Sequence, residues 1–287
     1  MLPLRDIVRN FLTSRGFKLE KKFGQNFLIS QEVLDTIVEI ADLQKTDRVV
    51  EIGPGMGVLT KELLPRVDSV TAIELDPRVP PLLLEYVRPE IATGGRLEII
   101  QGNALKVPLP DAPYKIVANI PYHITSPLLR HAFLESARPP EAMTLMIQRE
   151  VAEKIIDTDH AGMLTILVAL FGTPTLIAIV PPESFLPPPD VDSAILHIQS
   201  HGKPLADRPT IEKIFRLTKM AFAQKRKMLR NSLGNTPEGV AAMDAVGIDI
   251  KRRPETLDIE EWIALANAWF STGKEPTEEP EEAENTK

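Results

Sequence analysis

Short apolar runs alternate with amphipathic helical patterns along most of this 287-residue chain. The runs are rich in β-branched residues and have the length of buried strands. Those in the first half of the chain are Val49–Ile52, Ser69–Ile73, Leu97–Gln101 and Lys115–Ala118. From Gln31 to about Ser200 such runs alternate with helical segments, which is typical of a parallel sheet with helices on both faces. We therefore predict a doubly wound α/β domain.

A second, smaller domain is predicted where the pattern becomes helical throughout. The last expected strand, Ser193–Ile198, precedes a link that contains glycine and proline. The helical segments that follow are Ile211–Leu233, Pro237–Val246 and Ile259–Phe270. The uncharged stretch from Met163 to Val180 is long enough to suggest a membrane span, but a Gly/Pro-containing break at 172–175 divides it. We interpret it as a buried helix and a strand, and we expect no membrane segment.

The ends of the four early strands carry residues suited to binding a nucleoside. The first strand leads into a turn with glycines at 53, 55 and 57, whose backbone can approach a ligand closely. Glu74 ends the second strand 21 residues after Gly53, where a carboxylate can accept hydrogen bonds from ribose hydroxyls. Asn103 follows the third strand and Asn119 the fourth. Because such strand ends meet at one edge of the sheet, we predict an adenosine-containing cofactor beside a reacting amine.

The tetrapeptide Asn119-Ile120-Pro121-Tyr122 suits the binding of a planar, amino-substituted base. The side-chain carbonyl of Asn119 and the backbone carbonyl of Ile120 offer two acceptors for an exocyclic amine. Pro121 stiffens the loop, and Tyr122 offers a flat ring for stacking. The tetrapeptide alone is equally compatible with an ordinary turn after a strand. The residues at the neighbouring strand ends favour the binding site.

Six motifs resemble, in the same order, those of the small-subunit ribosomal RNA adenine N6,N6-dimethyltransferases, which use S-adenosylmethionine. They span nearly the whole chain: Phe23–Leu28, Glu51–Gly55, Ile73–Asp76, Asn119–Tyr122, Phe185–Ala194 and Ala221–Asn231. The resemblance implies a Rossmann-like methyltransferase domain with a smaller all-helical C-terminal domain. It also implies dimethylation of two adjacent adenosines in the 3'-terminal hairpin loop of small-subunit ribosomal RNA, with a role in small-subunit biogenesis.

The same resemblance implies roles for individual residues. Asn119, Ile120 and Tyr122 would act in catalysis, with Tyr122 stacking on an adenine that has left the helical stack. Phe185 is a second candidate for stacking, or else an ordinary core residue. The implied cofactor ligands lie in the loop 23–28, which would cover the cofactor, and at the strand ends: Asn26, Leu28, Gly53, Gly55, Glu74, Asn103 and Asn119.

Three places depart from the family pattern. Asn103 stands where aspartate is usual, although its carbonyl can still accept from an adenine amine. His123 and Thr125 differ from the usual residues after the tyrosine, a change that bears on how the target base or its neighbour is held. Met163 replaces a usual arginine and so removes a candidate phosphate or loop contact.

The net charge of −7 is unusual for an RNA-binding enzyme, but the charges are unevenly distributed. Six Glu and two Lys give residues 271–287 a charge of −4, which leaves −3 for the rest of the chain. Residues 213–230 hold seven Lys or Arg and no acid, and residues 5–22 carry +4. We predict that Lys225, Arg226, Lys227 and Arg230 contact ribosomal RNA phosphates; the alternative is a solvated helix face.

Composition completes the predicted organisation. The chain has no cysteine and no cluster with zinc spacing, so we expect neither disulfides nor a metal. Charged residues near the N-terminus argue against a secretory signal, and we expect a cytoplasmic monomer. The expected divisions are a basic lead-in (1–22), a methyltransferase domain (23–200), a helical RNA-contacting domain (201–270) and an acidic, disordered tail (271–287).

Other functions stay open beside the predicted one, whose partner would be small-subunit RNA within a pre-ribosomal particle. A large-subunit ribosomal RNA adenine methyltransferase of the macrolide-resistance type shares the Asn-Ile-Pro-Tyr form, although the segments 224–227 and 252–257 favour the small subunit. A non-catalytic ribosome-assembly factor is a second alternative, but the intact Glu74, Asn119 and Tyr122 argue against lost chemistry. The G-x-G-x-G spacing disfavours a nicotinamide oxidoreductase.

Overall fold

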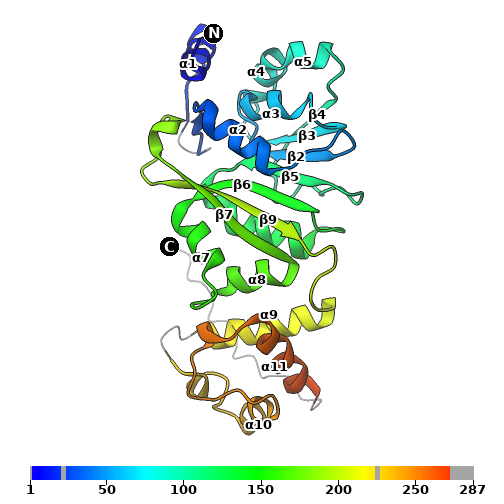
Figure 1. Cartoon of the computed structure of the whole chain (residues 1–287), viewed down its shortest axis with the longest axis vertical. Helices are drawn as coiled ribbons and strands as arrows, with labels where there is room; N and C mark the ends of the chain where they lie inside the picture. Colours follow the sequence, from blue (N-terminus) through cyan, green and yellow to red (C-terminus); the bar gives the residue numbers. More distant parts are fainter. Residues whose placement is uncertain (1, 21–23, 224–226, 272–287) are drawn as a thin grey trace. The chain divides into compact units, whose positions relative to one another are not determined.

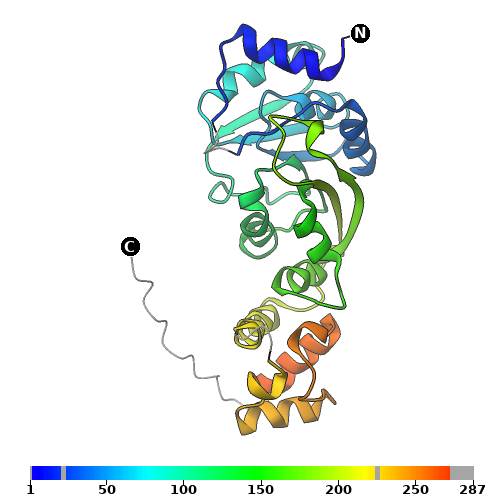
Figure 2. The same cartoon turned by 90° about the vertical axis from the view of Figure 1, so that its left-hand side faces the viewer.

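The computed structural model describes residues 2–20, 24–223 and 227–271. The chain divides into two compact units, with the break between Leu205 and Ala206. The strands of the described residues all belong to the first unit, whereas the second is helical and is drawn in yellow to red-orange in Figures 1 and 2.

A seven-stranded sheet forms the centre of the first unit (Figure 1). Its strand order is β4-β3-β2-β5-β6-β9-β7. The strands are β2 (Arg48–Ile52), β3 (Ser69–Glu74), β4 (Leu97–Gln101), β5 (Lys115–Asn119), β6 (Ala142–Gln148), β7 (Gly172–Val180) and β9 (Ser193–Ser200). The expected strands at 49–52, 69–73, 97–101, 115–118 and 193–198 are confirmed, as is the division of 163–180 into a helix and a strand.

The direction of the strands corrects one prediction. β4, β3, β2, β5 and β6 are parallel, as the alternation of strands and helices predicts. β9, however, pairs antiparallel with both β6 and β7, so the prediction of an entirely parallel sheet is wrong at this edge. The physical reason is the connection: β7 leads back to β9 without an intervening α-helix, which allows an antiparallel pair but no parallel crossover.

Helices cover the middle of the sheet on both faces. Every residue of β6 from Ala142 to Ile147 is buried, and alternate side chains of a strand point to opposite faces. The helices of this unit are α1 (Leu4–Ser14), α2 (Gln31–Ile40), α3 (Val58–Leu63), α4 (Val79–Tyr86), α5 (Arg88–Ala92), α6 (Thr125–Arg130), α7 (Arg149–Ile156) and α8 (Met163–Phe171). Local chemistry sets their starts; for example, the Ser30 side chain accepts from the backbone N–H of Val33 at the beginning of α2.

A second, two-stranded sheet joins two distant parts of the chain. β1 (Phe27–Leu28) pairs antiparallel with β8 (Phe185–Leu186), with Phe27 opposite Leu186 and Leu28 opposite Phe185. Phe27, Leu28 and Phe185 are all buried in the core. The motif expected to be a loop over the cofactor is therefore anchored at its end by backbone pairing.

The second unit is built from α9 (Arg208–Phe222), α10 (Pro237–Ala245) and α11 (Ile259–Ser271). Its core includes the fully buried Trp262, Leu265, Ile214 and Leu217. Phe222 is only partly buried, and its ring lies 6.2 Å from that of Trp262. Ile214, Leu217 and Phe222 thus mark the packed face of α9.

The expected helix from Ile211 to Leu233 is wrong in its second half, because α9 ends at Phe222. Residues 229 and 230 turn away from helical pairing: the backbone N–H groups of Leu229 and Arg230 donate to the carbonyls of Arg252 and Ile250, each over 2.8 Å. Leu229 is itself fully buried, so tertiary packing overrides the helical pattern at this point.

Candidate active site

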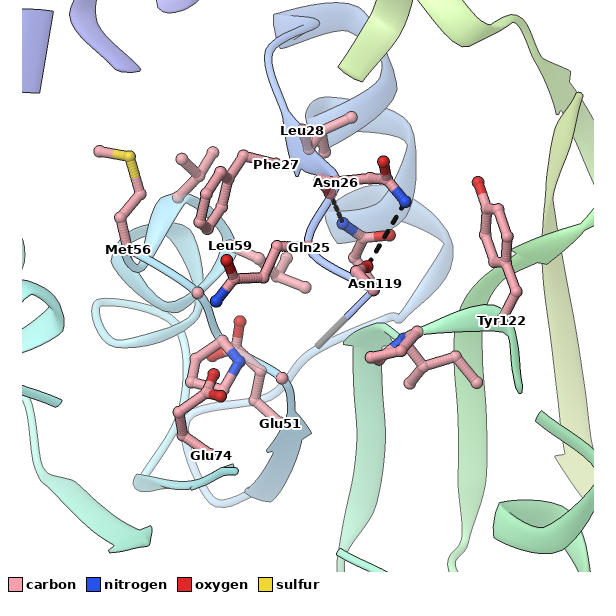
Figure 3. Close-up of a pocket in the computed structure, with 17 residues that line it drawn as sticks. Gln25, Asn26, Phe27, Leu28, Glu51, Met56, Leu59, Glu74, Asn119 and Tyr122 are labelled. Atoms are coloured by element: carbon pink, nitrogen blue, oxygen red, sulfur yellow. Dashed lines mark hydrogen bonds between the residues drawn. The ribbon is translucent and has the colours of Figure 1, made fainter. Parts of the chain in front are cut away.

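A pocket opens at the carboxyl edge of the parallel strands (Figure 3). Three strand ends and one covering segment build it. The strand ends contribute the glycine turn after β2, Glu74 from β3, and Asn119 with the following loop from β5. The covering segment is residues 24–28, all of which line the pocket. The structure thus gathers most of the predicted site residues around one cavity: Asn26, Leu28, Gly53, Gly55, Glu74, Asn119, Ile120 and Tyr122.

The glycine turn is tightly packed by the covering segment. Gly53 and Gly55 both have a positive φ, at +67° and +55°, which favours glycine at each position. A Cβ atom on Gly55 would lie 2.6 Å from the ring of Phe27. Gly55 is therefore required for two reasons, its backbone conformation and the close approach of the Phe27 ring.

Glu74 presents a buried carboxylate at the end of β3. Its side chain is 7% exposed, and one oxygen accepts from the backbone N–H of Asp76 at 2.8 Å. Burial raises the pKa of Glu74, while backbone donors at Asp76, Gly55 and Leu75 partly counteract that rise. An ionised carboxylate has about four acceptor positions, so Glu74 can accept from a pair of hydroxyls in addition to the Asp76 N–H.

Glu51 is a pocket residue to which sequence reasoning assigned no role. It lies in β2 two residues before Gly53, is 1% exposed, and accepts from the Thr60 hydroxyl at 2.6 Å. Burial is the main reason that its pKa rises to about 8, and the nearby Glu74 adds to the rise. A signal was present in the sequence, since an acid within an otherwise apolar strand next to a glycine turn is unusual.

Asn119 is oriented by the covering segment. Its side-chain Nδ2 donates to the backbone carbonyl of Asn26 at 3.0 Å (Figure 3). The Asn26 side chain in turn donates to the carbonyl of Gly24 at 3.4 Å. With its nitrogen engaged, Asn119 is left with its Oδ1 as the group that can accept from a ligand. The neighbouring Ile120 belongs to the same pocket wall.

Tyr122 stands on the opposite side of Asn119 from the Glu74 end of the pocket (Figure 3). Its hydroxyl and that of Ser193, at the start of β9, are 2.5 Å apart. Thr125, one of the departures from the family pattern, is buried and its hydroxyl donates to the Tyr122 carbonyl at 3.0 Å. Burial raises the pKa of Tyr122, so the phenol stays protonated at neutral pH. The ring is thus fixed at both its hydroxyl and its backbone.

Two predicted site residues lie elsewhere. Asn103 is exposed and is not among the lining residues; its Oδ1 accepts from the backbone N–H of Leu105 at 2.9 Å, forming a local turn. Phe185 is 2% exposed and belongs to the hydrophobic core, which favours the alternative of ordinary core packing over base stacking. Its backbone pairing with Leu28, across more than 150 residues of sequence, is what buries it.

The remaining predicted residues are exposed or lie outside the described residues. Lys227 and Arg230 are exposed in the second unit, while Lys225 and Arg226 lie outside the described residues. His123 is exposed, and Met163 is 40% exposed at the start of α8. In the described part of the chain, no group of three or more His, Cys, Asp or Glu is placed to hold a metal ion. Nor is any helix there long and apolar enough to cross a membrane.

Comparison with known proteins identifies the family. Residues 16–270 match the family described as ribosomal RNA adenine dimethylase. The chain belongs to this family. The dimethylase match covers both units. A curated relative is the ribosomal RNA small subunit methyltransferase A of Dehalococcoides mccartyi strain CBDB1. It is 41% identical over 259 residues, which make up 86% of this chain and 87% of the relative.

Solved structures agree with this assignment to the dimethylase family. A dimethyladenosine transferase from Plasmodium falciparum is 26% identical and superposes with a TM-score of 0.74, covering 86% of this chain and 98% of that one. The 23S rRNA methyltransferase ErmE is 27% identical, with a TM-score of 0.70 and coverage of 85% and 99%. The predicted Rossmann-like methyltransferase fold with a helical C-terminal region is therefore confirmed, and the protein is an S-adenosylmethionine-dependent ribosomal RNA adenine dimethyltransferase.

The residues of the pocket fit this cofactor. A ribose needs acceptors for its two hydroxyls, and Glu74 supplies a buried carboxylate beside the glycine turn. Among the described residues that line the cavity none is basic, so a cationic sulfonium meets no like charge there. Met56, Leu59 and Ile120 provide apolar lining.

Proposed function

We propose that this dimethyltransferase acts on the small ribosomal subunit and modifies two adjacent adenosines in the 3'-terminal hairpin loop of its RNA. The single observation that carries the proposal is the 41% identity, over 86% of the chain, to an enzyme named for the small subunit. The likeness to the 23S enzyme is weaker at 27% identity. Such a substrate implies a cytoplasmic enzyme with a role in small-subunit biogenesis; a monomeric state stays a prediction.

We assign the catalytic roles to the loop after β5. The target amine is flat and weakly nucleophilic, because its lone pair is shared with the adenine ring. The Oδ1 of Asn119 and the carbonyl of Ile120 would accept its two hydrogens and stabilise the positive charge that develops on nitrogen. The hydrogen bond from Asn119 Nδ2 to Asn26 supports this role, because it orients the amide so that Oδ1 is the acceptor available to the base.

Tyr122 would hold the target adenine by stacking after the base leaves its helix. The Ser193 hydroxyl fixes the ring through its contact with the phenol oxygen, so little side-chain entropy is lost when the base binds. When bound, S-adenosylmethionine supplies an electrophilic methyl group next to this loop. A singly methylated amine keeps one hydrogen for Asn119 or Ile120, and the same residues can therefore support the second transfer.

Incubation with radiolabelled cofactor tests this function directly. Small subunits that lack the modification should accept methyl groups, and mass mapping of RNA fragments should place dimethyladenosine in the 3'-terminal hairpin loop. Large subunits and free 23S RNA serve as the comparison. Methylation confined to large-subunit RNA would favour the macrolide-resistance alternative, and methylation of neither would favour a non-catalytic assembly factor.

A further inference from the structure

A group of hydrogen-bonded side chains joins the covering segment to the loop after β3. The Nε2 of Gln25 donates to Asp76 Oδ2 at 2.8 Å, and the backbone N–H of Glu20 donates to Gln25 Oε1 at 3.2 Å. Both ends of the Gln25 amide are thus engaged, and Figure 3 shows its side chain reaching toward Glu51 and Glu74. Gln25 can leave this position only by giving up both hydrogen bonds.

Arg78 strengthens this junction between the covering segment and the loop after β3, because it also binds Asp76. Its Nε donates to Asp76 Oδ1 at 2.9 Å and its Nη2 to Asp76 Oδ2 at 2.6 Å. The guanidinium also pairs with Glu20 at 2.6 Å and lies 4.9 Å from the centre of the Phe17 ring. Arg78 therefore holds residues on both sides of the junction: Asp76 in the loop, and Phe17 and Glu20 in the chain that leads into the covering segment.

Asp76 connects this junction to the cofactor pocket. Its side chain is completely buried, and Arg78 holds its pKa below the usual range, so it is ionised. Its backbone N–H donates to Glu74 Oε1 at 2.8 Å. Asp76 does not line the pocket. Yet it is bonded both to the residue proposed to bind ribose and to the segment that covers the pocket.

We propose that Gln25, Asp76 and Arg78 form a latch that keeps the covering segment closed over the bound cofactor and sets the rate at which the cofactor leaves. Cofactor held between residues 24–28 and the strand ends can escape only when the segment moves, and the Gln25–Asp76 bond must break for that movement. At its other end the segment is held by the β1–β8 pairing and by Asn119. Asp76 and Arg78 act as positioning residues, and the inference rests on the proposed cofactor site.

Cofactor release from single variants tests the latch. The full-length protein is loaded with tritiated S-adenosylmethionine and chased with an excess of unlabelled cofactor. Gln25→Ala should release cofactor about tenfold faster, because one hydrogen bond to a buried carboxylate is lost. Gln25→Glu should release it faster still, because a second carboxylate would face Asp76. Circular dichroism of each variant should match that of the wild type, which a general loss of structure would not allow.

Arg15→Ala is the matched control, because Arg15 ties the same N-terminal region to α4 through Glu85 without touching Asp76. Its release rate should equal that of the wild type. Equal release rates for Gln25→Ala and Arg15→Ala would overturn the latch, as would faster release that is accompanied by a loss of helical signal in circular dichroism. Glu74→Ala separates the two proposals. If it binds cofactor normally, the proposed site itself fails; if it binds weakly while Gln25→Ala releases normally, only the latch fails.

Discussion

The side-chain Nδ2 of Asn119 donates to the backbone carbonyl of Asn26 across 3.0 Å, between residues 93 positions apart in the chain. This one bond joins the loop that would hold the target amine to the segment that covers the cofactor pocket. It also decides which end of the Asn119 amide faces a ligand, because the nitrogen is engaged and Oδ1 remains. Binding of cofactor under the segment and orientation of the acceptor for the amine are therefore coupled.

Replacement of Asn119 by alanine should abolish methyl transfer while cofactor affinity stays within a few-fold of the wild type. Loss of one transition-state acceptor typically lowers the rate by about 100- to 1000-fold. Single-turnover methylation of small subunits measures the rate, and calorimetry with S-adenosylhomocysteine measures the affinity. A variant that keeps a third of the wild-type rate would show that Ile120 and positioning suffice.

Replacement of Glu74 by alanine should weaken cofactor binding by about 1–3 kcal/mol, since two hydroxyls would lose a buried acceptor. Titration calorimetry on the folded variant provides the value, and circular dichroism confirms folding. Glu74→Gln keeps one acceptor oxygen, so its cofactor affinity should fall between those of the wild type and Glu74→Ala. Unchanged affinity in the folded alanine variant would remove Glu74 from the ribose site.

Two substitutions of Tyr122 separate stacking from hydrogen bonding. Tyr122→Phe loses only the contact to Ser193, and we expect less than about a tenfold loss of rate. Tyr122→Ala loses the ring, and base–aromatic stacking is worth about 1–3 kcal/mol, so binding of the target RNA should weaken by roughly 5- to 150-fold. Equal effects of the two variants in RNA binding and single-turnover assays would assign the role to the hydroxyl instead.

Much of the fold was predictable because local signals determine it. The first four predicted strands and the glycine turn have strong periodic or compositional patterns, and the structure brings the ends of β2, β3 and β5 together at the pocket. The antiparallel direction of β9 depends on pairing between distant segments, which has no local signal. The burial of Phe185 has the same cause, since it follows from pairing with Leu28. Asn103 shows a further limit, because an asparagine beside a strand end can equally cap its own turn.

The raised pKa of Glu51 predicts how stability changes with pH. The folded protein holds a proton on Glu51 up to about pH 8, whereas the unfolded chain releases it near the ordinary value of 4.5. The folded state thus binds more protons in this interval, and the Glu51 contribution to the free energy of unfolding falls as pH rises from 4.5 to 8. Glu51→Gln cannot ionise and should reduce this decline. Urea unfolding of the wild type and Glu51→Gln across this pH interval measures the decline. Parallel curves of the free energy of unfolding against pH would contradict the raised pKa of Glu51.

Removal of the basic side chains of the second unit should weaken binding to small ribosomal subunits and reduce its dependence on salt. Lys227 and Arg230 are exposed, and Lys225 and Arg226, which lie outside the described residues, complete the predicted set. Each phosphate contact that is lost should lower the salt slope by about 0.7–0.9, because fewer counterions are released on binding. Cofactor affinity should not change, because the residues proposed to bind it belong to the first unit.

A charge-matched control distinguishes this contact from a general effect of net charge. Arg48 begins β2 and Arg96 immediately precedes β4, so both exposed side chains lie at the sheet edge opposite the pocket. The double variant Lys227→Ala/Arg230→Ala and the control Arg48→Ala/Arg96→Ala lose the same charge, yet only the first should lower the salt slope in filter binding at several salt concentrations. The four-residue variant should lower it further. Equal slopes for both double variants would mean that the second unit presents a solvated face, and that the phosphates are held by other residues.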